Sequence, residues 1–154
     1  MKLKGSVRAW VIRALEDPVA RILAKNSHLT KIQLETLLID LISDNLSDFP
    51  LKYDEKVKFR LTKAKISRGS FNRTLQQAKG NVVKAIYTII LLGYLGVFED
   101  TKLDSYIEIA NELNRYIEAY RENSNISKDQ TERKNMVKMI RDDLEKRLAE
   151  FSKM

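Results

Sequence analysis

The stretch KAKISRGSFNRTLQQAKGN (Lys63–Asn81) carries cationic and amide side chains and no carboxylate. Helical spacing places part of this set on one side of a predicted helix: Arg68, Gly69, Asn72, Arg73 and Gln76. Arginine can bond a guanine edge or a phosphate, and asparagine and glutamine can bond an adenine edge. A glycine near the helix start lets another molecule approach the backbone closely. These five residues are therefore candidate readers of base edges in DNA.

A second set surrounds the first and consists of Lys63, Lys65, Ser67, Lys79 and Lys84. Lysine ammonium groups neutralise phosphates without regard to base sequence. Ser67 can cap the predicted helix, whose first amides favour an anion. We expect this set to contact phosphate. The alternative is a basic helix face that is simply solvated.

The positive charge of the chain is concentrated around this stretch. The 154 residues carry a formal net charge of +7. Residues 52–84 hold 10 Lys/Arg against 2 Asp/Glu, a net +8, whereas residues 99–154 hold 11 against 13, a net −2. A concentrated field of one sign attracts polyanions. A protein that is merely rich in lysine would scatter its charge more evenly.

The composition argues against several kinds of chemistry. There is no cysteine, and His28 is the only histidine, so disulfides, thiolate metal sites and Cys–His catalysis are excluded. Neither phosphate-binding glycine motif, GxxxxGK[ST] or GxGxxG, occurs. The Asp142-Asp143 pair fits solvated helix charges better than an acid–base site. We expect no enzyme activity, metal, cofactor or small-molecule substrate.

The longest apolar run, AIYTIILLGYLGVF (Ala85–Phe98), is about four residues short of the ~18 that a membrane span needs. We predict a buried core helix here, with Tyr87, Tyr94 and Phe98 in the core and a helix end near Gly93–Gly96. The N-terminus lacks an apolar signal region. We expect a cytoplasmic, nucleoid-associated protein with no membrane partner.

Helices must position all of these residues, because the chain has only two prolines and five glycines. The sequence predicts an all-α fold. Asp17-Pro18 has the pattern of a helix start, and Thr30 with Gln33 has the pattern of a capping box. Gly80-Asn81 is predicted to break or bend the candidate reading helix.

The segment from Leu61 to Leu75, LTKAKISRGSFNRTL, has the parts of a helix-turn-helix. A short helix from Asp54 to Leu61 would precede a tight turn that Ile66 plugs, and Ser67 would cap the second helix. Phe71 and Leu75, four residues apart, would face inward. The outward side of the second helix, residues 67–79, would then enter a major groove.

These residues resemble the recognition segment of helix-turn-helix regulators. The matching positions are Ile66, Ser67, Ser70, Phe71 and Arg73, in a region of about 20 of the 154 residues. Lys65 stands where the turn usually has glycine. The run IYTIILLGYLGVFED (Ile86–Asp100) is also similar to archaeal winged-helix-like regulators, and Val97-Phe98 leaves room for a minimal wing. The resemblance implies DNA binding and no particular regulator.

The C-terminal region carries apolar residues at alternating steps of three and four: Leu103, Tyr106, Ala110, Leu113, Ile117 and Tyr120. This heptad-like seam is typical of coiled-coil helices. It could pair with a second copy or fold back on its own domain. We favour a homodimer, because dimers suit recognition of two half-sites.

The sequence therefore predicts a helix-turn-helix domain in residues 1–98 and a helical dimerisation or packing region in residues 101–154. The predicted function is DNA binding in transcriptional regulation. Two alternatives stay open. One is a helical protein–protein interaction module in which the basic stretch is incidental, and the other is RNA binding by the basic face.

Overall fold

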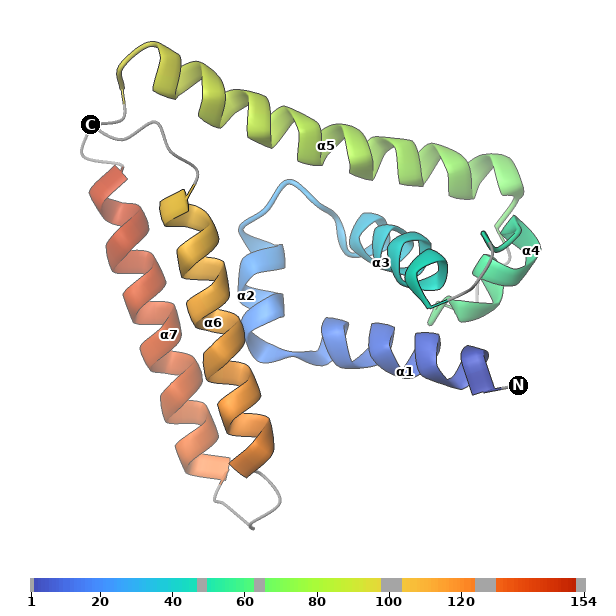
Figure 1. Cartoon of the computed structure of the whole chain (residues 1–154), viewed down its shortest axis with the longest axis horizontal. Helices are drawn as coiled ribbons and strands as arrows, with labels where there is room; N and C mark the ends of the chain where they lie inside the picture. The colour runs from blue at the N-terminus through green and yellow to red at the C-terminus, as the bar shows by residue number, and fades with distance from the viewer. Residues whose placement is uncertain (1, 47–49, 63–65, 98–103, 124–129, 152–154) are drawn as a thin grey trace. The chain divides into compact units, whose positions relative to one another are not determined.

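The computed structural model describes residues 2–46, 50–62, 66–97, 104–123 and 130–151 (Figure 1). These residues form helices and connecting segments, and no strand occurs among them. The predicted all-α class is confirmed. The chain divides into two units, Met1–Tyr87 and Thr88–Met154, and the division falls inside a helix.

The first unit contains α1 (Lys2–Glu16), α2 (Pro18–Lys25), α3 (Lys31–Asn45), α4 (Tyr53–Lys56), the short 3₁₀ helix η1 (Val57–Phe59) and, as far as Tyr87, α5 (Arg68–Tyr94). The predicted caps at the starts of α2 and α3 are confirmed. The Asp17 carboxylate accepts the N–H of Ala20 at 2.8 Å. Thr30 Oγ1 accepts the N–H of Gln33 at 3.2 Å, and Gln33 Oε1 accepts the N–H of Thr30 at 3.0 Å. These reciprocal bonds satisfy donors at the start of α3.

One apolar cluster holds the first unit together. Its buried members are Val7, Val11, Ile39, Ile42, Phe59, Phe71 and Leu75. They come from α1, α3, η1 and α5, so each of these helices contributes a face to the same core. The rings of Tyr53 and Phe71 meet edge to face with centroids 5.5 Å apart. This is a favourable aromatic arrangement. Phe71 and Leu75 therefore point inward, as predicted.

A partly buried ionic cluster lies beside this core. Lys56 Nζ is 2.8 Å from Asp40 and 2.8 Å from Asp44, and Lys79 Nζ is 2.8 Å from the other oxygen of Asp40. Burial alone would raise the pKa of Asp40, but the bonds and charges of Lys56 and Lys79 outweigh it and hold that pKa below its ordinary value. Burial would likewise lower the pKa of Lys56, and Asp40 and Asp44 raise it overall.

A second buried carboxylate orders the segment that follows η1. Glu35 is 2% exposed, and its Oε1 accepts the N–H of Leu61 at 2.6 Å. Its other oxygen lies 3.5 Å from the guanidinium of Arg60. A buried carboxylate needs such partners, because an unpaired charge is costly away from water. Glu35 therefore fixes the chain path between η1 and α5.

Helix α5 runs for 27 residues without a break, so the prediction that it ends at Gly80-Asn81 is wrong. A helical glycine costs about 1 kcal/mol relative to alanine, which packing can override. Asn81 takes part in this packing, because its Nδ2 donates to the carbonyl of His28 at 3.0 Å and to Gln33 Oε1 at 3.3 Å. The helix ends instead before Gly96, whose φ of 72° suits glycine, and the N–H of Val97 reaches the carbonyl of Leu92 at 3.0 Å. The predicted helix end at Gly93–Gly96 is confirmed.

The C-terminal half of α5 is not the predicted core helix. Tyr87 is 68% exposed and Tyr94 is 86% exposed. Neither ring is buried, so the prediction of core positions is wrong for both. Phe98 lies outside the described residues. Val97 is not in a strand, and the wing predicted at Val97-Phe98 is therefore not seen at the one of its two residues that the structure describes.

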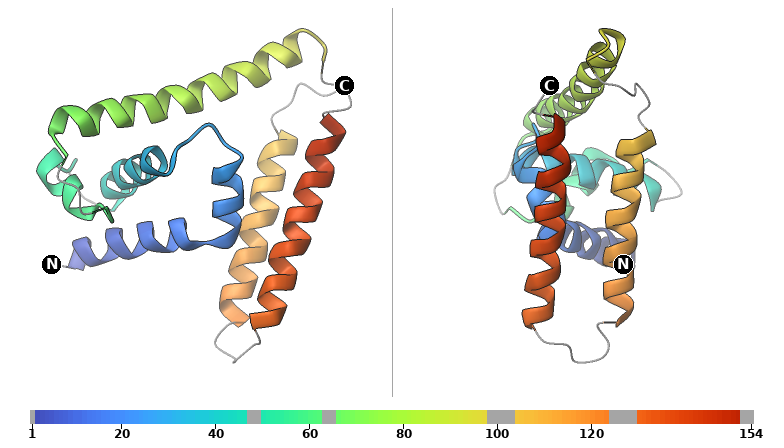
Figure 2. Two further views of the ribbon diagram at one scale, coloured as in Figure 1. Left: turned by 180° about the vertical axis from the view of Figure 1, so that it is seen from behind. Right: turned by 90° about the vertical axis from the view of Figure 1, so that its left-hand side faces the viewer.

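The second unit contains α6 (Asp104–Asn123) and α7 (Gln130–Phe151), which run antiparallel (Figures 1 and 2). Ile140 and Leu144 are each 8% exposed and lie one turn apart on α7. Of the predicted seam, Ala110 is exposed and Leu113 is half-buried. Leu103 lies outside the described residues, as do the side chains of the other three members, Tyr106, Ile117 and Tyr120. Pairing through this seam stays a prediction.

Candidate nucleic-acid interface

The N-terminal half of α5 presents a polar side to solvent. Its exposed members are all five of the candidate base readers: Arg68, Gly69, Asn72, Arg73 and Gln76. The opposite side is buried, with Phe71 at 2%, Leu75 at 7% and Ala78 at 0% exposure. A helix of 3.6 residues per turn separates two such sides cleanly. The predicted orientation is confirmed, whereas reading of bases stays a prediction.

Local capping explains where this polar side begins. Ser67 Oγ accepts the N–H of Ser70 at 3.1 Å, and the Ser67 carbonyl accepts the N–H of Phe71 at 3.0 Å. The predicted cap is therefore confirmed. Just before it, Ile66 is half-buried against the core, and its carbonyl accepts the hydroxyl of Tyr53 at 2.5 Å. Ile66 thus anchors the entry to α5, as predicted.

The connection into α5 is longer than a helix-turn-helix turn. The first helix was predicted to reach Leu61, but η1 ends at Phe59 and Arg60 is already extended, with ψ of 140°. The described residues of this connection, 60–62 and 66–67, lie outside the helices, whereas the motif uses a turn of about three or four residues. The N–H of Leu61 is bonded to Glu35, which holds the chain out of the helix. Lys65, the predicted turn residue, lies outside the described residues.

The candidate phosphate contacts have different surroundings. Lys79 is bonded to Asp40, and its side chain is 45% exposed. A phosphate at Lys79 would have to compete with that carboxylate, which makes Lys79 a poorer contact than its sequence position indicates. Lys84 is exposed on the next part of α5. Lys63 and Lys65 lie outside the described residues.

An open groove of about 580 Å³ joins part of this surface to the start of α3. Its lining is Gln33, Arg73, Gln76, Gln77, Gly80, Asn81 and Lys84. The groove brings together three predicted contacts, Arg73, Gln76 and Lys84. Sequence reasoning missed Gln33, Gln77 and Asn81. No sequence pattern indicated that Gln33 lines this groove. It lies on a separate helix, and its role in the capping box already accounted for its position.

The electrostatics of this surface follow from composition. No aspartate or glutamate occurs between Glu55 and Glu99, so α5 carries cations and no carboxylate. Arg68 and Arg73 are exposed on it, and its buried face contacts an apolar core. The field along this half of the helix is therefore positive, which favours a polyanion.

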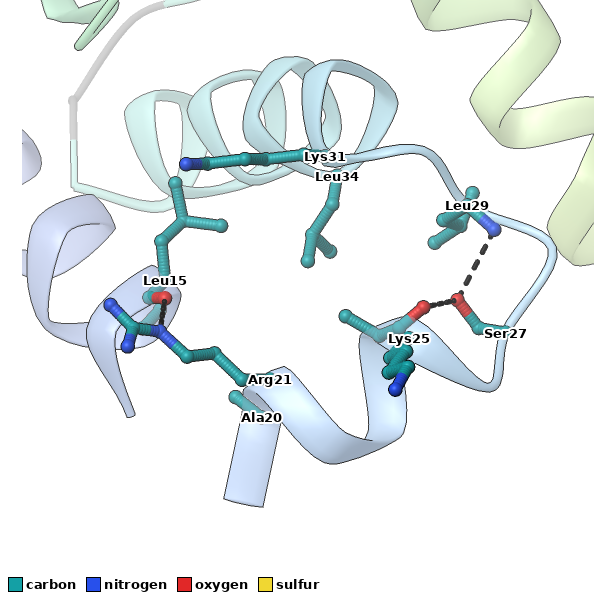
Figure 3. A pocket seen from close by; sticks show the side chains of 10 residues that line it. Leu15, Ala20, Arg21, Lys25, Ser27, Leu29, Lys31 and Leu34 are labelled. Carbon is teal, nitrogen blue, oxygen red and sulfur yellow. Dashed lines mark hydrogen bonds between the residues drawn. The ribbon is translucent and has the colours of Figure 1, made fainter. Parts of the chain in front are cut away.

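A separate pocket of about 410 Å³ lies between α2 and the start of α3 (Figure 3). Leucine and alanine side chains line it, and Arg21, Lys25 and Lys31 are exposed around it. Arg21 Nε donates to the carbonyl of Leu15 at 3.1 Å, which closes one side of the pocket. Ser27 Oγ accepts the N–H of Leu29 at 3.1 Å on the other side. No sequence pattern indicated this pocket, because three separate segments form it.

No known protein family, curated protein or solved structure matches this chain. Among the described residues, no group of histidine and acidic side chains is placed to hold a metal ion. None of the helices within those residues has the length and apolar content to cross a membrane. The structure thus defines the class as an all-helical protein with a long, cationic, partly exposed helix.

Proposed function

We propose that this is a DNA-binding protein that regulates transcription by inserting the N-terminal half of α5, residues 67–79, into a major groove. The observation that carries the proposal is the two-sided helix. Its polar side is exposed and free of carboxylates, and Phe71 and Leu75 fix the other side to a core. An α-helix fits a major groove, and Arg, Asn and Gln match base edges there. In this proposal α4, η1 and α5 form a helix-turn-helix variant with a lengthened turn.

Binding of DNA is expected to depend on Arg73. Replacing Arg73 with alanine should weaken binding to a preferred duplex by about 1–3 kcal/mol and reduce sequence preference, because a base contact is lost. The matched control is Arg8→Ala, which removes an exposed arginine from α1 and should leave affinity nearly unchanged. Fluorescence anisotropy with labelled genomic duplexes, repeated over a range of salt concentrations, measures both effects.

The salt series separates the alternatives. A DNA reader should lose affinity steeply as salt rises, because binding releases counterions from the phosphates. Tighter binding to structured RNA than to any duplex DNA would favour the RNA alternative. If neither nucleic acid binds at low salt, the proposal is wrong and the alternative of a protein–protein interaction module is favoured.

Close approach of the α5 backbone to DNA gives a prediction in which stability and binding change in opposite directions. In Gly69→Ala the new methyl group meets only Ser67 Oγ, at 3.9 Å, so the fold accommodates it. Alanine should stabilise the helix by up to about 1 kcal/mol. The same methyl group would hold the backbone away from DNA and weaken binding severalfold. Thermal unfolding and anisotropy report the two quantities.

The control for this experiment is Gly80→Ala. A methyl group at Gly80 meets nothing within 4 Å, and Gly80 lies beyond the proposed reading segment. It should stabilise α5 similarly and affect DNA binding less. Equal binding by Gly69→Ala and the wild type would show that Gly69 is not a close-approach position.

A further inference from the structure

A single stripe of residues runs along the solvent side of α5 and changes character halfway. Its members follow steps of three and four residues: Gly69, Asn72, Gln76, Gly80, Val83, Tyr87, Ile90 and Tyr94. This spacing keeps all eight on one side of a helix. The first four are glycine or polar, and the last four are large and apolar. The surface proposed to meet DNA thus continues directly into an apolar surface.

The apolar part of the stripe is uncovered. Val83 is 50% exposed and Ile90 is 53% exposed, and the two tyrosines are more exposed still. Ile86 and Leu91 flank the stripe at 44% and 54% exposure. Scaled by side-chain size, these six exposures correspond to roughly 700 Å² per chain, more than a monomeric protein usually leaves in one apolar patch. A standard interface takes about 600–1,000 Å² from each partner, and the patch falls within that range.

Two properties of this patch fit a second copy of the chain. Val83, Tyr87, Ile90 and Tyr94 are spaced by four, three and four residues, which is the spacing of a helix that pairs with another helix. No charged side chain occurs between Lys84 and Glu99, so two copies can meet there without burying like charges. A patch of this kind is complementary to itself, as a twofold interface requires.

We propose that the chain forms a homodimer through the C-terminal half of α5, with Val83, Tyr87, Ile90 and Tyr94 as the seam. This places the dimer contact on the same helix as the proposed DNA contact, rather than in the seam of residues 103–120. The proposal does not require DNA binding, and its test contains no nucleic acid.

The test is the mass of the full chain in solution, measured by sedimentation equilibrium at micromolar concentrations. The wild type should have twice the 17.9 kDa of one chain. Ile90→Glu should weaken dimerisation at least about 100-fold, because each chain would bury an unpaired carboxylate at the seam. The variant should keep its helix content, since Ile90 is outside the core cluster. The control is Ile32→Glu, which changes an isoleucine of 51% exposure on α3 and should stay dimeric.

Two results would overturn the proposal. A monomeric wild type is one, and a sharp fall in its melting temperature on Ile90→Glu would then show that the chain covers this patch itself. A dimer that survives Ile90→Glu is the other, and its dissociation on Leu113→Glu would place the contact in α6. Because DNA affinity is measured separately with Arg73→Ala, either proposal can fail without the other.

Discussion

Replacing Asp40 with asparagine should lower the free energy of unfolding by about 3–5 kcal/mol at neutral pH. The Asp40 side chain is 11% exposed and is bonded to both Lys56 and Lys79. The variant would leave Lys56, whose side chain is also 11% exposed, with half of its anionic partners. Denaturant unfolding followed by circular dichroism measures the change.

The control is Asp44→Asn, because Asp44 binds the same ammonium group at the same 2.8 Å from a side chain that is 42% exposed. Solvent screens such a pair, and its loss should cost about 1 kcal/mol or less. Equal effects of the two substitutions would show that burial does not set the strength of this cluster.

The same cluster predicts how stability depends on pH. The pKa of Asp40 lies below its ordinary 3.8 in the folded protein. Its contribution is therefore complete above pH 3.8 and is lost as the pH falls through the lower, folded value. The pKa of Lys56 lies above 10.5, so its contribution is lost as the pH rises through that higher value. The stability difference between the wild type and Asp40→Asn should accordingly shrink below pH 3.8.

Phe71→Ala should be the other large loss, about 3–5 kcal/mol, because it removes an aromatic ring from a core position that is 2% exposed. The cavity would open where Phe71 meets Tyr53 and the core residues of α1 and α3. The midpoint of chemical unfolding should fall, and Phe71→Leu should recover most of it. Trp10→Ala is the control, because this ring on α1 is 46% exposed. Similar losses for Phe71 and Trp10 would contradict the described core.

Short-range patterns in the sequence predicted local structure well. The caps at Asp17, Thr30 and Ser67 involve partners three residues away, so the sequence contains the whole interaction. The inward direction of Phe71 and Leu75 follows from helical spacing alone. The uninterrupted course of α5 could not be predicted this way. It involves Asn81 and the carbonyl of His28, which are 53 residues apart.

Charge counting overstated the free positive charge of the candidate interface. Residues 52–84 have a net +8, but Lys56, Arg60 and Lys79 face carboxylates of α3. Adding those three carboxylates, Glu35, Asp40 and Asp44, lowers the local sum from +8 to +5. The sequence alone could not assign these partners, because they precede the basic stretch and only the folded chain brings them together.

The exposure of Tyr87 and Tyr94 could not be predicted from the sequence either. Apolar residues dominate Val82–Leu92, with Lys84 and Thr88 as the exceptions, and such a run does not by itself distinguish a buried helix from an exposed one. The first helix stops short of Leu61, where the predicted tight turn would follow it, for a related reason. The bond from Leu61 to Glu35 decides the chain path there, and those residues are 26 positions apart.

The unbroken course of α5 through Gly80 has a geometric consequence for the chain. Each residue turns a helix by about 100°, so the polar and apolar parts of the stripe share one direction only while the number of residues between them is kept. Removing one residue near Gly80 would swing Tyr87 and Ile90 a quarter-turn or more away from Asn72 and Gln76. Adding or removing seven residues would nearly restore the alignment, because seven residues make almost two full turns. Along this helix of about 40 Å, spacing in the sequence therefore sets the direction in which each side chain leaves the helix axis.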